Sequence, residues 1–159
     1  MRIALPDLPM PEAVMVRLIR ITVAGMTEYF EPVFRKMGLT ENAFHVLCLL
    51  MASEQRRASP SELSDLVGTS RANMTRILEL LERDGFASRT VEARDARRHV
   101  IEITEKGRNA SVLAVPQMAG PLKRAFAGLS PKEFANLTEL LQKVATSFDT
   151  TRMPMRAAI

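Results

Sequence analysis

Residues 59–85 read SPSELSDLVGTSRANMTRILELLERDG, and this stretch decides the fold. Its first four residues, Ser-Pro-Ser-Glu, have the pattern of a capping box with proline at the first helical position, so a helix is predicted to begin there. Gly68 permits a sharp turn, and Thr69 or Ser70 can cap a further helix that runs to about Arg83. Two helices joined by a tight turn of this kind form the helix-turn-helix arrangement.

Apolar residues recur at helical spacing in both helices and predict their buried sides. The residues expected to face inward are Leu63, Leu66 and Val67 in the first helix and Met74, Ile77, Leu78 and Leu81 in the second. The opposite side of the second helix carries Arg71, Ala72, Thr75, Arg76 and Glu79.

A helix that enters the major groove of DNA needs short polar side chains and arginine near its N-terminus. The candidates for this role are Ser70, Arg71, Asn73, Thr75 and Arg76. The alternative is an ordinary solvated helix face, so the residues that follow have to decide between the two.

After Gly85 the period changes from that of a helix to that of a strand. Residues 86–92 and 98–104 are rich in β-branched residues, and the polar connector 93–97 lies between them. We predict a two-stranded hairpin, which directly after a helix-turn-helix is a wing. Four arginines fall within ten residues of this hairpin, namely Arg89, Arg94, Arg97 and Arg98, and a hairpin tip of arginine suits a narrow minor groove. The predicted wing therefore favours DNA binding, rather than simple exposure to solvent, as the role of the polar side of the preceding helix.

Helices are predicted on both sides of this unit. Residues 11–36 carry one apolar stripe, within which Pro32 is expected to end or kink the helix. Thr40 is the predicted N-cap of a helix over residues 41–53, which is apolar almost all round and should therefore be buried. Helical pattern returns after residue 104, where Pro116 and Pro121 are expected to kink it.

The final helix is predicted from a second capping box at residues 130–133. Its apolar residues alternate spacings of three and four, as in a seam along which helices pack, and they are Phe134, Leu137, Leu141, Val144 and Phe148. An isolated terminal helix would leave this seam in water, so we expect a homodimer.

Composition and charge narrow the function classes. The 159 residues suit one domain, and the net charge of +4 with a pI of about 9.7 suits a polyanionic partner. Cys48 is the single cysteine, so we expect a reducing, cytoplasmic setting without an intramolecular disulfide. No run of about 18 apolar residues exists, which argues against a membrane span. With two histidines and no glycine-rich phosphate loop, the sequence offers no catalytic or metal site and no cofactor motif.

The same residues resemble the multiple antibiotic resistance regulator (MarR) family of winged helix-turn-helix transcription regulators. The resemblance is carried by residues 61–63 through 85–86, by Asp95-Ala96-Arg97 in the wing, and by Thr104-Glu105-Lys106-Gly107 at the entry to the next helix. Gly38-Leu39-Thr40 is similar to the family's junction before the second helix. The sequence departs from the commonest wing pattern at Ala96, where the family often has a basic residue.

The resemblance implies a mainly α fold of six helices with a small β-hairpin wing. It implies that residues 11–37 and 105–148 form dimerisation helices and that residues 39–104 form the DNA-binding lobe. It further implies a sequence-specific regulator of double-stranded DNA with a pseudo-palindromic operator, commonly a repressor. Among the wing candidates Arg94, Asp95, Arg97 and Arg98, it points to Arg97 as the minor-groove reader and to Asp95 as its orienting partner. A simple turn role for Asp95 stays open.

The resemblance also implies release by small aromatic acids or phenols bound between the lobe and the dimer helices. The candidates for an effector pocket are Tyr29, Phe30, His45 and Met51, although such a stripe can equally belong to the core. Redox sensing by Cys48 is not expected, because its apolar neighbours should raise the thiol pKa. The alternative to DNA binding is a winged-helix module for protein interaction, which would expose apolar residues rather than arginine at the wing.

Overall fold

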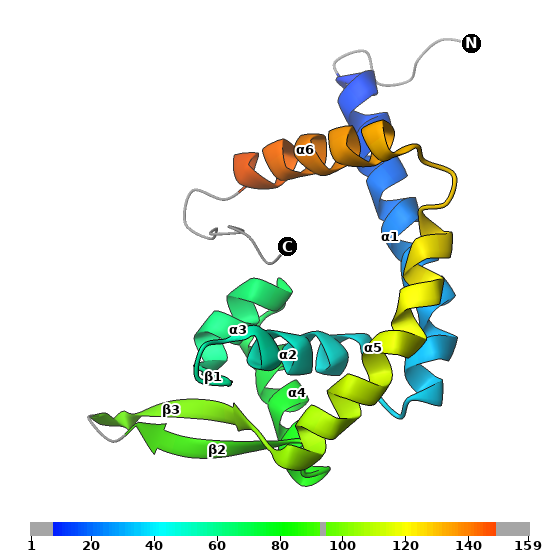
Figure 1. Ribbon diagram of the computed structural model, residues 1–159. Helices are drawn as coiled ribbons and strands as arrows, with labels where there is room; N and C mark the ends of the chain where they lie inside the picture. The colour runs from blue at the N-terminus through cyan, green and yellow to red at the C-terminus, as the bar shows by residue number, and fades with distance from the viewer. Residues whose placement is uncertain (1–7, 93–94, 149–159) are drawn as a thin grey trace.

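The computed structural model describes residues 8–92 and 95–148, with only the backbone path for residue 92 and residues 95–98 (Figure 1). Six helices and three strands follow one another in these residues. They are α1 (Met10–Lys36), α2 (Glu41–Ala52), β1 (Arg57–Ala58), α3 (Pro60–Val67), α4 (Arg71–Arg83), β2 (Ala87–Glu92), β3 (Asp95–Ile103), α5 (Glu105–Ala125) and α6 (Pro131–Ser147). The predicted fold class, mainly α with a small antiparallel wing, is confirmed.

The hydrophobic core is centred on α2, which packs against α1, α3, α4, α5 and β3. Ala43, Val46, Leu47 and Leu50 of this helix are completely buried. Thr40 caps α2 by accepting a hydrogen bond from the backbone N–H of Ala43 at 3.2 Å, as predicted. The inward stripe of α4 is also confirmed, since its four predicted residues are all buried.

The helix-turn-helix has the predicted boundaries, but one residue that was predicted to be buried is exposed. Ser59 and Glu62 form the capping box of α3, and Gly68 takes a left-handed conformation with φ of 72° at its C-terminus. Leu63 is buried as expected, but Leu66 is 52% exposed. A helix of eight residues buries only one narrow side, and Leu66 lies outside it.

The wing sheet differs from the predicted hairpin in two ways. β3 begins at Asp95, so most of the predicted connector belongs to a strand, and β2 pairs with it from Ala87–Ile103 to Glu92–Asp95. A third strand, β1, pairs antiparallel with β3 through Arg57–Glu102 and Ala58–Ile101. Two residues are too few to carry a strand periodicity, which is why β1 was not predicted.

The prolines do not end the long helices. α1 continues through Pro32 to Lys36, and α5 continues through Pro116 and Pro121 to Ala125. Each proline removes a single backbone hydrogen bond, which a long helix with its other turns intact can lose without ending. The carbonyl of Pro121 accepts a hydrogen bond from the Tyr29 hydroxyl at 3.4 Å, which ties α5 to α1.

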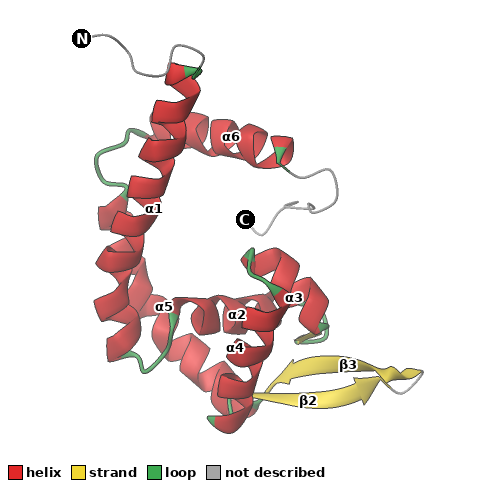
Figure 2. Ribbon diagram, turned by 180° about the vertical axis from the view of Figure 1, so that it is seen from behind, coloured by secondary structure: helices red, strands yellow, loops and turns green. Residues whose placement is uncertain are grey.

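The long helices extend away from the lobe. Figure 2 shows α1 and α5 side by side, with α6 crossing α1 at its end far from the wing. α6 has no buried residue, and α1 buries only Phe30 and Phe34 in 27 residues. No helix in the described part of the chain is long and apolar enough to cross a membrane.

Candidate nucleic-acid interface

The turn before α4 is held by side-chain hydrogen bonds. The hydroxyl of buried Ser64 donates to the carbonyl of Thr69 at 2.8 Å, and Ser70 caps α4 by accepting from the backbone N–H of Asn73 at 3.2 Å. The Asn73 amide donates to the Thr69 hydroxyl at 2.7 Å. These bonds fix the first turn of α4 relative to α3. They also engage the side-chain amide of Asn73, which was predicted to face the major groove and which is only partly exposed.

The outer side of α4 carries two arginines with no partner. Arg71 and Arg76 are exposed, and their side chains make no hydrogen bond or ion pair within residues 8–92 and 95–148. Thr75 is exposed between them, and its hydroxyl donates to the carbonyl of Arg71 at 3.0 Å, which leaves its methyl group available for an apolar contact. Free guanidinium groups beside a capped helix N-terminus can bind guanine edges or phosphates.

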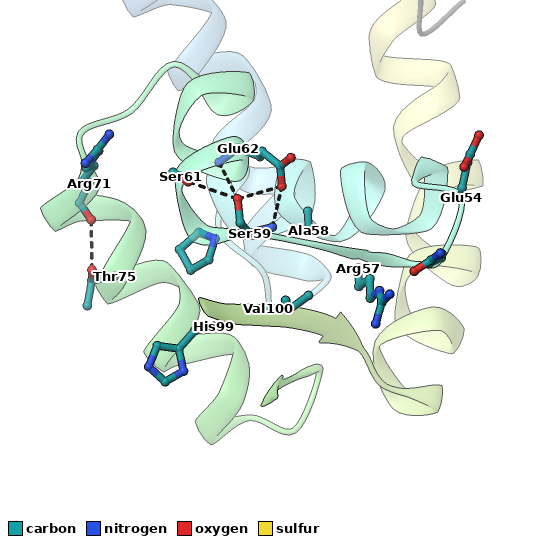
Figure 3. Close-up of a pocket in the computed structure, with 12 residues that line it drawn as sticks. Glu54, Arg57, Ala58, Ser59, Ser61, Glu62, Arg71, Thr75, His99 and Val100 are labelled. Atoms are coloured by element: carbon teal, nitrogen blue, oxygen red, sulfur yellow. Dashed lines mark hydrogen bonds between the residues drawn. The ribbon is translucent and has the colours of Figure 1, made fainter. Parts of the chain in front are cut away.

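A groove of about 780 Å³ lies beside this part of α4 (Figure 3). Arg71 and Thr75 line it from α4, His99 and Val100 from β3, and Arg57 from β1. The remaining lining comes from Ala58 of β1, from residues 59–62 at the start of α3, and from Glu54 and Gln55 after α2. Arg57 and His99 were not predicted from the sequence, because neither lies on the predicted recognition helix or at the predicted wing tip.

The base of the wing is joined to the end of α4 by an ion pair. The Nε atom of Arg89 on β2 lies 3.1 Å from the Oε1 atom of Glu82, and both side chains are about one third exposed. Arg89 is therefore paired inside the lobe and is not part of a free arginine cluster at the wing tip. Arg94 lies outside the described residues, and the side chains of Asp95, Arg97 and Arg98 lie outside them as well.

The start of α5 is joined to the same corner. The hydroxyl of Thr104 donates to the carbonyl of Gly85 at 2.7 Å and caps α5 by accepting from the N–H of Gly107 at 3.0 Å. Lys106 donates to the carbonyl of Asp84 at 2.8 Å. The residues that resemble a family motif thus connect α4, the start of the wing and α5.

The four effector candidates have different surroundings. Phe30 is buried in the core, with its ring centroid 5.0 Å from that of Tyr29. Tyr29 is 44% exposed, His45 is exposed on α2, and Met51 is half-buried against the core. None of the four lines the groove beside α4.

Cys48 has the environment expected of a structural thiol. It is half-buried in α2, and burial raises the pKa of the thiol from its ordinary value. The described residues contain no group of three His, Cys, Asp or Glu side chains that could hold a metal ion.

Known proteins share both the sequence and the architecture of this chain. The family model "MarR family" matches residues 39–99. The transcriptional repressor MprA of Escherichia coli K12 is 29% identical over 143 residues, which covers 90% of this chain and 81% of MprA.

Two solved structures extend the likeness to the whole fold. Sco3205, a MarR family transcriptional regulator from Streptomyces coelicolor solved in complex with DNA, matches with a TM-score of 0.84 at 20% identity, covering 91% of this chain and 95% of its own. The PcaV transcriptional regulator from the same organism, solved with its natural ligand, matches with a TM-score of 0.77 at 19% identity, covering 94% and 99%. Residues 39–99 therefore carry the sequence of the MarR family, and the chain has the winged helix-turn-helix fold of MarR family transcriptional regulators.

Proposed function

We propose that the protein is a dimeric, sequence-specific repressor that binds a pseudo-palindromic operator and is released by a small effector. The observation that carries the proposal is a pair of exposed arginines on the capped helix α4 beside the wing, Arg71 and Arg76, which have no partner among the described residues. Residues 70–76 of α4 enter the major groove, and the wing with Arg97 reaches the adjacent minor groove. Bound over a promoter, such a dimer represses by occlusion.

The proposed dimer uses residues 11–37 and 105–148, while residues 39–104 form the DNA-binding lobe. Support comes from the apolar side chains that these helices leave exposed in a single chain. The seam of α6 is an example, with Phe134 and Leu141 each 47% exposed. A second copy that packs on α1, α5 and α6 would remove these side chains from water, at a gain of roughly 25 cal/mol per Å².

The proposed effector is a small aromatic acid or phenol that binds between the lobe and the dimer helices. The proposed pocket residues are Tyr29 and Phe30 on α1 and His45 and Met51 on α2. Support comes from the likeness in fold to PcaV, which has a natural ligand. Screening aromatic carboxylates and phenols for release of bound DNA, with Tyr29→Ala as the comparison, tests this part separately.

Alanine substitutions on α4 and the wing test DNA recognition. Arg71→Ala, Arg76→Ala and Arg97→Ala should each weaken binding to the selected operator about tenfold or more, because a good bidentate contact is worth about 1–3 kcal/mol. The matched control is Arg83→Ala at the far end of α4, where the guanidinium pairs with Asp84 at 3.0 Å. Affinity measured by fluorescence anisotropy at fixed salt should be unchanged in the control. Unchanged affinity in a test variant removes that arginine from the site.

A further inference from the structure

We propose that the groove between α4 and β3 seats the DNA strand that separates the major from the minor groove, and that Arg57 and His99 contact its phosphates. This inference rests on the proposed function, and it adds contacts outside the recognition helix and the wing tip. It assigns a role to two residues that the helix-turn-helix pattern does not include.

The position of the groove gives the first argument. Its walls come from the recognition helix on one side and from the wing strand β3 on the other. With α4 in the major groove and the wing tip in the neighbouring minor groove, one sugar-phosphate strand must pass between α4 and the wing. That path lies over the groove, so the side chains that line it from β1 and β3 face phosphate rather than base edges.

The charges of the groove give the second argument. Its basic residues are Arg57, Arg71 and His99. Figure 3 shows His99 on the side of α4 and Arg57 towards the opposite end, so the two are spread along the groove rather than gathered at one point. Phosphate contacts spread along a strand are what positions a protein on a duplex without reading its sequence.

The availability of these side chains gives the third argument. Arg57 is 42% exposed, and its closest carboxylate is that of Glu102, with Nη1 and Oε1 4.0 Å apart. Such a long, exposed pair is weak and can be exchanged for a phosphate. The His99 side chain is exposed and makes no hydrogen bond or ion pair in the described part of the chain.

The carboxylates of the groove do not compete strongly for a phosphate. Glu62 accepts hydrogen bonds at 2.7 Å from both the backbone N–H and the hydroxyl of Ser59, so it belongs to the α3 cap. Glu54 lies after α2, and Figure 3 shows it at the end of the groove farthest from Arg71. Arg57 and His99 line the stretch between these two ends.

The test uses the dependence of affinity on salt, because each phosphate contact changes the slope of log K against log salt by about one. Arg57→Ala should flatten this slope by about one per groove, hence by about two per dimer. The same variant should weaken binding to the selected operator and to an unrelated duplex of equal length by the same factor. Arg57→Lys should keep the slope. His99→Arg, which adds a permanent charge, should steepen it by a similar amount and tighten binding to both duplexes.

Two matched controls separate a local contact from a general effect of charge. Arg83→Ala removes an arginine from the far end of α4, and Asn136→Arg adds one on exposed α6, across the molecule from the groove. Both should leave the slope unchanged. The inference is overturned if Arg57→Ala and His99→Arg both keep the native slope. His99→Arg decides the matter alone if Arg57→Ala fails to fold.

Failure of the proposed function has a different signature. A native protein that binds the selected and the unrelated duplex equally well contradicts sequence-specific recognition, yet its salt slope still tests the groove on the unrelated duplex. A native protein that binds neither duplex overturns both proposals.

Discussion

Single residues at the corner between α4, the wing and α5 have almost no freedom to change. Gly107 is the clearest case, because a Cβ atom built there would lie 2.0 Å from the carbonyl oxygen of Phe86 and 2.8 Å from Cγ1 of Ile103. The backbone of α5 approaches the start of the wing more closely than any side chain permits. The glycine of the Thr-Glu-Lys-Gly motif is therefore explained by packing.

Gly107→Ala should lower the free energy of unfolding by about 3 kcal/mol, since the added methyl group forces backbone to move in a packed region. Urea denaturation followed by circular dichroism measures the change. Gly128→Ala is the control, because nothing lies within 4 Å of its Cβ position, and it should change stability by less than about 0.5 kcal/mol. Equal stability of the two variants would contradict the close approach at Gly107.

At the scale of elements, the position of the wing relative to α4 depends on the Glu82–Arg89 ion pair. Glu82→Arg or Arg89→Glu alone should lower the free energy of unfolding by about 1 kcal/mol or more, because each change places two like charges beside each other at a partly buried position. The double variant restores opposite charges and should recover at least about 0.5 kcal/mol relative to the sum of the single changes. The double-mutant cycle is measured by denaturation and, in parallel, by operator affinity. Strict additivity would mean that the pair does not join the wing to α4.

The elements that sequence predicted well are those with local signals. Helix starts at Thr40, Ser59, Ser70 and Ser130 follow from capping residues that bond within three positions, and each cap is present. At Ser130 the hydrogen bonds to Glu133 also lower the pKa of that carboxyl. Local bonding of this kind can be inferred without knowing the fold.

The features that sequence missed depend on tertiary contacts. Strand β1 forms by pairing with β3. Arg89 is not a free arginine of the wing, because Glu82 of α4 lies beside it and forms an ion pair with it. Arg57 and His99 line the same groove although they are 42 positions apart in the chain, and no sequence motif could reveal this. In the candidate site, the residues of α4 could be predicted from the sequence, whereas the groove and the ion pair beside them could not.

At the scale of the whole molecule, the proposed dimer rests on the apolar side chains that α1, α5 and α6 leave exposed. Leu141→Asp places a charge in the α6 seam and should convert the dimer to a monomer, as should Phe134→Asp, because an unpaired carboxylate in an apolar interface is costly. Light scattering at several protein concentrations measures the mass. Gln142→Asp, one residue outside the seam, should remain dimeric. A dimeric Leu141→Asp variant would refute the role of the seam.

The central claim is that this chain is a dimer that recognises a specific DNA sequence, and selection of bound sequences from a random duplex pool tests it most directly. The purified protein is incubated with the pool at about 150 mM salt, where nonspecific phosphate binding is largely screened. We expect enrichment of an inverted repeat whose half-site centres are about 10 bp apart, one turn of the DNA helix. A pool without an enriched sequence, or one enriched only in an unrepeated half-site, would contradict it.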